Sequence, residues 1–289
     1  MSYPFLKGHG TENDFVLLPD HDGSVHGDLS AERVRALCDR RAGIGGDGVL
    51  RVIRSERGRW DRTESGRSGR SETEASLLAR WPDSLNAAWF MDYRNSDGSL
   101  AEMCGNGIRV FARHLLEEGL VPADQPIAIG TRAGVKTLTR SGELWTADMG
   151  LARIVGDTKV SVGDRSWPAL HVDTGNPHAV VMLDDLAEAG SLAEEPTYDA
   201  RLYPEGVNVE FVVRRGVDHI AMRVHERGSG ETRSCGTGAC AAAVASAGAG
   251  PGRWRVDVPG GELEVSRDQE GRIYLTGPAL IVARGETDL

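Results

Sequence analysis

The sequence predicts an α+β protein built from two similar, pseudo-symmetric domains, each a mixed or antiparallel sheet wrapped around a central helix. Three observations predict this fold. The length of 289 residues suits two domains, strand-like runs outnumber helical patterns, and short motifs of the first half recur in the second. Hydrophobic residues make up 40% of the chain, enough for two cores. We expect one domain to comprise residues 1–148 with 278–289 and the other to comprise residues 149–277.

Strand-like runs account for most of the regular pattern. They are rich in β-branched and aromatic residues, and the clearest cover residues 48–53, 87–93, 178–182 and 207–213. Glycine-containing segments at 141–142, 259–261 and 270–271 separate further runs, as hairpin turns do. We therefore expect sheets whose strands are often joined by hairpins.

Three segments have the pattern of a helix. Ser30 can cap a helix whose apolar face includes Leu37. Residues 108–115 repeat apolar side chains at helical spacing, and the pattern stops at Gly119. Residues 239–247 are small and apolar on every side, so we expect that helix to be buried.

Residues 54–86 interrupt this pattern with a segment rich in Arg, Ser, Gly and Glu. We expect a solvated loop insertion within the first domain. A contact with nucleic acid is the alternative, but the net charge of −10 and the interspersed acidic residues disfavour it. We therefore expect no nucleic-acid partner.

The composition narrows the function further. No run approaches the ~20 apolar residues that span a bilayer, and residues 1–7 lack the start of a secretory signal. We therefore expect a cytoplasmic protein without a membrane partner. The four cysteines, Cys38, Cys104, Cys235 and Cys240, should be reduced, and their spacing does not match a zinc site. None of the few lysines lies in the phosphate-cradling setting of a pyridoxal-phosphate site, which disfavours that cofactor.

An internal repeat links the two halves. Each carries a Thr-x-Asn motif followed later by Cys-Gly-x-Gly, which opens a helix. Asn13 and Cys104 are 91 positions apart, and Asn176 and Cys235 are 59 apart. Without the 33 residues of the insertion at 54–86, the first separation becomes 58. A duplicated domain with a site at the interface explains this agreement, and chance similarity of short glycine motifs is the alternative.

A cysteine at a helix start has a chemical use. The first N–H groups of a helix lack intrahelical partners and carry partial positive charge, so they can hold a carboxylate and lower the pKa of a thiol. Glycines there let a ligand approach the backbone. If two such helix starts face each other, one thiolate can remove an α-proton while the opposite thiol delivers a proton to the other face, which inverts the carbon. We predict this role for Cys104 and Cys235. Cys38 and Cys240 fit the plainer interpretation of small buried hydrophobic residues.

The sequence resembles the diaminopimelate epimerase family. The matching segments keep the family order and are residues 10–15, 93–98, 103–107, 174–178, 206–208, 223–228 and 234–238. The resemblance implies cofactor-independent interconversion of L,L- and meso-diaminopimelate, which serves lysine and peptidoglycan precursor synthesis, at a cleft between the two domains. It also implies that the enzyme uses neither a metal nor pyridoxal phosphate. It implies that Cys104 is the proton donor and Cys235 the acceptor in the L,L-to-meso direction. We also expect a homodimer.

The resemblance extends to the residues around the cysteines. Backbone N–H groups of the helix starts would hold the reacting carboxylate, and they belong to Gly105, Asn106, Gly236 and Thr237. The distal carboxylate would be held by Asn95, Asn176, Asn208 and Arg227. Glu226 would meet an ammonium group, His178 and Glu226 would tune the protonation of the cysteines, and Asn13 would contact the substrate. Each of these residues also has a plainer interpretation, as a turn or cap, a surface ion pair or a core histidine.

Two departures from the family pattern and three alternatives stay open. The insertion at 54–86 is longer than that of a typical family member. Gly48 stands where the family often has glutamine, so a substrate contact is in doubt there. A proline or hydroxyproline racemase is the nearest alternative, but such enzymes tend to carry histidine in place of Asn106, and their substrate lacks a distal charged end. An isomerase of the same fold without the cysteine pair and an inactive amino-acid-binding homologue are disfavoured by the presence of both cysteines.

Overall fold

The computed structural model describes residues 2–27, 29–55, 86–247 and 250–289. Most of the predicted insertion at 54–86 therefore lies outside the described residues. Within the described residues, no helix is long and apolar enough to cross a membrane.

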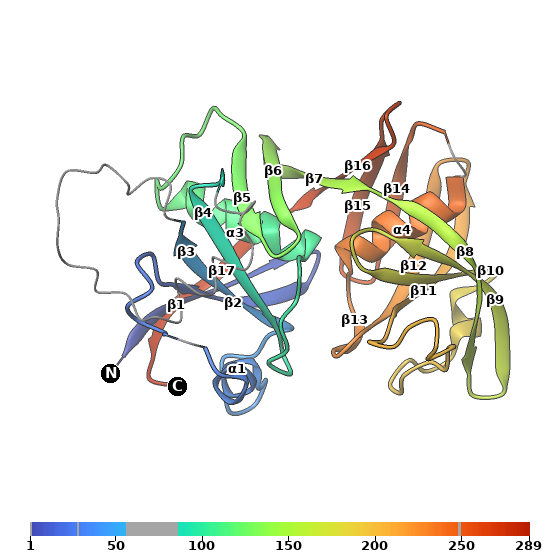
Figure 1. Cartoon of the computed structure of the whole chain (residues 1–289), viewed down its shortest axis with the longest axis horizontal. Coiled ribbons are helices and arrows are strands. Elements are labelled where there is room, and N and C mark those ends of the chain that lie inside the picture. The colour runs from blue at the N-terminus through green and yellow to red at the C-terminus, as the bar shows by residue number, and fades with distance from the viewer. Residues whose placement is uncertain (1, 28, 56–85, 248–249) are drawn as a thin grey trace.

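The first half of the molecule is a sheet wrapped around α3 (Gly105–Glu117), with α1 (Ala31–Cys38) packed on its outside. Its strands are β1 (Tyr3–Gly10), β2 (Asn13–Pro19), β3 (Gly48–Arg54), β4 (Trp89–Asn95), β5 (Ile127–Thr131), β6 (Gly134–Ser141), β7 (Leu144–Leu151) and β17 (Leu280–Thr287). Figure 1 shows both chain ends in this half, because β17 returns from the second half to pair with β1.

The second half is built in the same way around α4 (Gly236–Ala247), with the short 3-10 helix η3 (Leu186–Ala189) at its side. Its strands are β8 (Arg153–Val162), β9 (Arg165–Asp173), β10 (Pro177–Leu183), β11 (Asn208–Gly216), β12 (His219–Glu226), β13 (Gly230–Thr232), β14 (Gly252–Val258), β15 (Gly261–Arg267) and β16 (Arg272–Pro278). α4 is buried along nearly its whole length, as expected for a helix that is apolar on every side.

The pairing of the strands confirms the pseudo-symmetry. The order is β17-β1-β2-β3-β4-β5-β6-β7 in the first half and β8-β9-β10-β11-β12-β14-β15-β16 in the second. Each pair of neighbouring strands in the first order is parallel or antiparallel in the same way as its counterpart in the second order. The parallel pairs are β2–β3 and β4–β5 in the first half and their equivalents β10–β11 and β12–β14 in the second. In each half the central helix lies in the connection between the second pair of parallel strands, since parallel strands need a long crossover connection.

The two halves meet along β7 and β16, which are equivalent strands and pair antiparallel. Figure 1 shows these strands crossing the middle of the molecule. One hydrophobic core continues across this junction and includes residues of both α3 and α4. We propose the two wrapped sheets as the domains, and the expected boundary after residue 148 then falls inside β7.

The local predictions agree with this fold. Ser30 caps α1, since its hydroxyl accepts a hydrogen bond from the Arg33 N–H. The second predicted helix stops just before Gly119, which has a positive φ of 66°. The predicted hairpins at 141–142, 259–261 and 270–271 connect β6 to β7, β14 to β15 and β15 to β16. These turns and helices are confirmed.

Candidate active site

Both predicted cysteines lie at the start of a central helix. Cys104 is the N-cap of α3, and its Sγ accepts a hydrogen bond from the Gly107 N–H at 3.4 Å. Cys235 directly precedes α4, and its Sγ accepts from the Gly238 N–H at 3.3 Å. The repeated motif therefore folds into the same local geometry twice, with both sulfurs buried.

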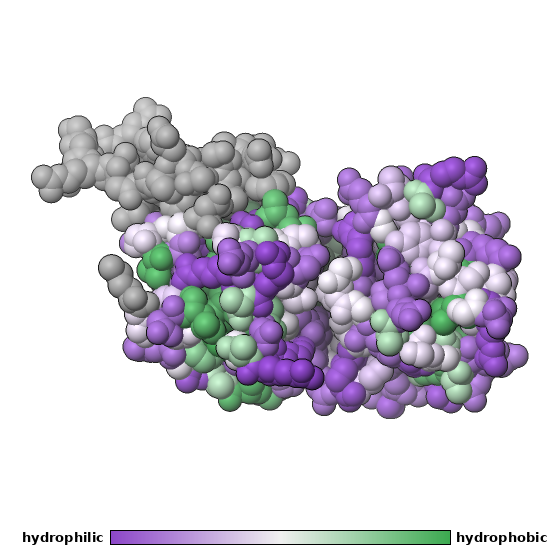
Figure 2. All heavy atoms as spheres, turned by 90° about the horizontal axis from the view of Figure 1, so that it is seen from below, coloured by the Kyte–Doolittle hydropathy of each residue, from purple (hydrophilic) through white to green (hydrophobic). Residues whose placement is uncertain are grey.

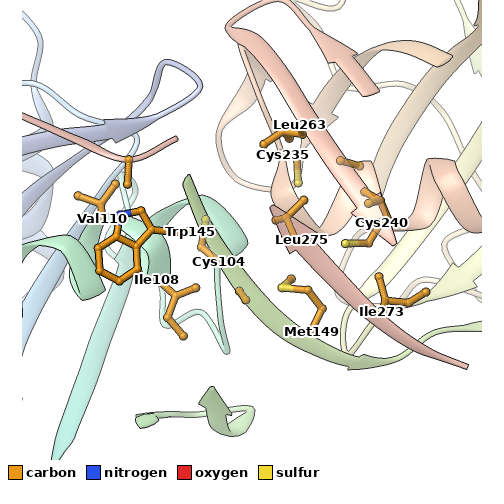
Figure 3. Close-up of a cluster of buried hydrophobic side chains, with 14 of the residues drawn as sticks. Cys104, Ile108, Val110, Trp145, Met149, Cys235, Cys240, Leu263, Ile273 and Leu275 are labelled. Carbon is orange, nitrogen blue, oxygen red and sulfur yellow. The ribbon is translucent and has the colours of Figure 1, made fainter. Parts of the chain in front are cut away.

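The two helix starts contact each other. A methyl group added at Gly236 would lie 2.9 Å from Cα of Gly105, and both glycines also pack against Leu275 of β16. Figure 3 shows that Cys104 and Cys235 belong to opposite halves of the molecule and that Leu275 lies near both. The lack of a side chain at these two glycines therefore also lets the two helix starts meet.

This contact has an electrostatic consequence. The N-terminal ends of α3 and α4 each carry partial positive charge, and their approach is unfavourable without a negative group nearby. An anion held between them would contact unpaired N–H groups from both helices. The arrangement is therefore suited to a carboxylate.

A buried polar network ties the first half to the second beside the cysteines. The Asn106 side-chain amide donates at 3.1 Å to Asn13 Oδ1, to the Ser234 carbonyl and to Ser234 Oγ. Thr11 Oγ1 lies 2.6 Å from Ser234 Oγ, and Cys104 Sγ lies 3.6 Å from Asn13 Oδ1. The Asn106 side chain thus joins Asn13 of its own half to Ser234 of the second half.

A second network follows from Cys235 into the second half. Thr237 Oγ1 lies 3.4 Å from Cys235 Sγ and 3.5 Å from Asn176 Nδ2. Asn176 Oδ1 lies 3.0 Å from Nε2 of His178, whose Nδ1 lies 2.7 Å from Glu210 Oε1. His178 and Glu210 are both fully buried, so the histidine acts on this region as part of a pair with a carboxylate.

Glu210 was not among the residues predicted from the sequence. It is the one charged residue in the run at 207–213, which is apolar except for Asn208, and an acidic residue is almost never fully buried unless it has a partner. Its Oε1 would lie 2.6 Å from a methyl group added at Gly238, so it adjoins the start of α4. That unusual residue type in a buried strand was the signal that could have identified it.

The residues predicted to hold a distal carboxylate are only partly together. Asn208 Oδ1 accepts from the Arg227 backbone N–H at 2.9 Å, and Arg227 and Asn176 line one pocket of about 190 Å³. The Arg227 guanidinium lies 3.8 Å from the carboxylate of Glu102, which belongs to the other half. Asn95 instead bonds Ser99 within its own turn, at 3.0 Å.

The surface is hollowed between the two halves, as Figure 2 shows. A cleft of about 530 Å³ on this seam is lined from the first half by residues such as Asp14 and Asp47 and from the second by residues such as Thr232 and Arg233. Among the described residues, no group of three or more His, Cys, Asp or Glu could hold a metal ion.

Burial dominates the protonation of both thiols. It raises the pKa of Cys104 to about 12, and the nearby Glu226 carboxylate adds to the rise, while the N–H groups of Gly107 and Asn106 oppose it. Burial likewise raises the pKa of Cys235 well above its ordinary value, with Glu226 and Glu210 adding to the rise. The expectation of a lowered thiol pKa is therefore wrong for this arrangement, because desolvation outweighs the helix N–H groups.

Glu226 is predicted to make stability depend on pH. Burial raises its pKa to about 7 from an ordinary value of 4.5, although a hydrogen bond from Thr232 partly opposes this. The folded state therefore binds this proton more tightly, so the contribution to stability is full below pH 4.5 and is lost as pH rises to about 7. Relative to the Glu226→Gln variant, we expect the wild-type free energy of unfolding to fall by about 1–3 kcal/mol across this range.

Urea unfolding at a series of pH values would measure this difference. Glu262→Gln, which changes an exposed side chain, is the matched control. Its free energy of unfolding should depend on pH in the same way as that of the wild type. Parallel curves for wild type and Glu226→Gln would contradict a raised pKa at this position.

Gly48 has no room for a side chain. A methyl group there would lie 2.5 Å from the Arg94 carbonyl oxygen and 2.7 Å from the ring of Tyr93. Gly48 pairs with Phe15 between β2 and β3. Asn208 pairs with His178 between the equivalent strands β10 and β11. Gly48 is therefore the counterpart of Asn208 in the first half. The buried Tyr93 ring fills the space that a longer residue at this position would need.

We therefore expect Gly48→Gln to lower the free energy of unfolding by about 3 kcal/mol through overpacking. Thermal unfolding would measure the loss. Gly156→Gln is the control, since a methyl group there meets no atom within 4 Å. Equal melting temperatures for the two variants would show that Tyr93 moves aside without cost.

The duplicated fold has the two-domain architecture of amino-acid epimerases and racemases. A cysteine lies at the start of the central helix in each half. A hydroxyproline epimerase from Agrobacterium vitis superposes with a TM-score of 0.63 at 14% identity over 99% of this chain and 92% of that one. A PhzF-family phenazine biosynthesis protein from Bacillus anthracis also gives 0.63 at 14% identity, over the full length of both chains. At this identity the likeness concerns the fold alone.

Sequence relatives define the family. The diaminopimelate epimerase family model matches residues 79–155 and 170–282. The diaminopimelate epimerase of Streptomyces coelicolor is 52% identical over 98% of this chain and 95% of its own length. That of Mycolicibacterium smegmatis is 46% identical over 98% and 96%. The chain belongs to the diaminopimelate epimerase family.

Proposed function

We propose that this chain interconverts L,L- and meso-diaminopimelate by passing a proton between Cys104 and Cys235. The observation that carries this proposal is the contact between two helix starts, each beginning with a buried cysteine. The α-carboxylate lies between these helix starts and accepts hydrogen bonds from N–H groups of Gly105, Asn106, Gly236 and Thr237. The α-carbon then lies between the two sulfurs.

The reaction balances without another reactant. In the L,L-to-meso direction, the Cys235 thiolate takes the α-proton as the C–H bond breaks, and the electron pair moves into the carboxylate as an enediolate. The S–H bond of Cys104 then breaks, and its proton forms a new C–H bond on the opposite face. Cys104 ends as the thiolate, so the reverse reaction exchanges the two roles. Fixed N–H groups stabilise the charge that develops on the carboxylate.

The high pKa values of the two thiols are compatible with this scheme. A substrate α-ammonium brings a positive charge next to the sulfurs, which favours the thiolate. Glu226, with a pKa of about 7, adjoins both cysteines and can exchange a proton near neutral pH. His178 contributes through Glu210, the carboxylate that also raises the pKa of Cys235.

The distal end of the substrate carries a second carboxylate and a second ammonium group. Arg227, Asn176 and Asn208 are grouped beside the pocket of about 190 Å³ and hold that carboxylate. Asn95 joins them by turning away from Ser99, and Asn13 completes the first-half side of the site. Glu226, which adjoins both cysteines, is the proposed partner of an ammonium group of the substrate.

The decisive test offers the purified protein L,L-diaminopimelate, proline and trans-4-hydroxyproline in D₂O. We expect α-deuterium incorporation and inversion with diaminopimelate alone. Turnover of either proline substrate in its place would overturn the assignment. The cytoplasmic location, the homodimer and the absence of a nucleic-acid partner stay predictions from the sequence.

A further inference from the structure

Arg109 of α3 is a fully buried cation that the mechanism above does not use. Its guanidinium donates from Nη1 to the Gly105 carbonyl at 3.0 Å and from Nη2 to Asn106 Oδ1 at 2.8 Å. Nε donates to the Pro278 carbonyl at 3.4 Å. Among the described residues no carboxylate pairs with it, and burial lowers its pKa to about 10. A buried charge without an ion-pair partner is costly and calls for a specific role.

The surrounding backbone is shaped to hold this guanidinium. A methyl group added at Gly10, the last residue of β1, would lie 2.9 Å from Nη2. A methyl group at Gly277, near the end of β16, would lie 3.1 Å from Nη2. Two strands from different halves therefore carry glycine where they pass the side chain. Arg109 is five residues after Cys104. The residue five positions after Cys235 in α4 is Cys240, so the second helix has no guanidinium at the equivalent position.

The hydrogen bonds of Arg109 lead from one cysteine to the other. Because Arg109 donates to Asn106 Oδ1, the amide nitrogen of Asn106 must face Asn13 and Ser234. Ser234 directly precedes Cys235. The bond to the Gly105 carbonyl also fixes the Gly105–Asn106 peptide, whose N–H lies at the start of α3.

We propose that Arg109 is a positioning residue that holds the Cys104 helix start against the Cys235 turn by orienting the Asn106 side chain and the Gly105–Asn106 peptide. This role rests on the proposed function, because positioning of the two helix starts matters for catalysis only if both sulfurs flank the substrate α-carbon. Lysine keeps the charge of Arg109 but lacks the planar group that donates in two directions at once.

The test compares Arg109→Gln and Arg109→Lys with Arg113→Gln as the matched control. Arg113 lies one turn further along α3 and forms partly exposed ion pairs with Glu117 and Glu143. With diaminopimelate, and at a temperature where thermal melts show full folding, we expect both Arg109 variants to lose about 30- to 100-fold in kcat. KM should stay within about threefold, because the loss concerns geometry in the transition state. The control should behave as wild type.

A second readout needs no substrate. The rate at which iodoacetamide alkylates Cys104 at a fixed pH, followed by peptide mapping, should fall in Arg109→Gln and less in Arg109→Lys, because the N–H groups that stabilise the thiolate lose their support. If wild type fails to epimerise diaminopimelate but this rate still falls, the proposed function is wrong and the role of Arg109 stands. Folded Arg109 variants with near-wild-type kcat and alkylation rates would overturn the role, and so would failure of both variants to fold, which would make Arg109 a determinant of the fold only.

Discussion

Alanine at position 104 or at position 235 is expected to lower kcat for diaminopimelate epimerisation by about a thousandfold or more. Each substitution removes one of the two groups that exchange protons with the α-carbon, and inversion needs both. The fold should survive, because Cys104→Ala and Cys235→Ala delete only one buried sulfur each at the helix starts. Inversion would be followed by the conversion of L,L- to meso-diaminopimelate, with circular dichroism to confirm folding.

Cys38→Ala is the matched control for this prediction. Cys38 is also a buried cysteine with a pKa raised by burial to about 12, but it is the last residue of α1 and packs in a separate core cluster with Val34 and Leu37. We expect its loss to affect stability and leave kcat unchanged. Near-normal turnover by either the Cys104 or the Cys235 variant would exclude the two-base scheme.

The second large effect is expected from Arg227→Gln. Arg227 is the cation of the proposed distal subsite, and a guanidinium bound to a carboxylate through two hydrogen bonds is a strong, geometrically specific contact. We expect kcat/KM to fall by about 10²- to 10³-fold, chiefly through KM, because a distal contact acts on binding. Initial rates over a range of diaminopimelate concentrations would separate the two constants.

Arg201→Gln supplies the comparison for Arg227. Arg201 is an exposed arginine of the same half that pairs with Asp199, so its loss should leave both constants unchanged. If Arg227→Gln kept the wild-type KM, the distal carboxylate would have to bind elsewhere, and the pocket lined by Arg227 and Asn176 would lose its assignment.

The sequence could predict those parts of the fold and site that repeat. The two Cys-Gly-x-Gly motifs marked both helix starts, and their order along the chain indicated the duplication. The contact between Gly105 and Gly236 was not predictable, because it depends on how β7 and β16 join the halves. Local sequence describes each helix start but carries no information on the packing of one against the other.

Burial explains the remaining differences. A thiol at an isolated helix start would have a lowered pKa, but tertiary packing around Cys104 and Cys235 reverses the direction. Gly48 looked like the loss of a substrate contact, whereas the structure shows the Tyr93 ring in that space. Each difference arises from residues distant in sequence, which periodicity and spacing do not reveal.

The return of β17 to the first half also affects the order of assembly. β17 is the outer neighbour of β1, so β1 keeps an open edge until β17 has been synthesised and has paired with it. During that interval the nascent first half exposes unpaired backbone groups, which are open to pairing with another chain. Completion of the first sheet is therefore a late event in folding, because it requires a strand from the far end of the described chain to pair with β1.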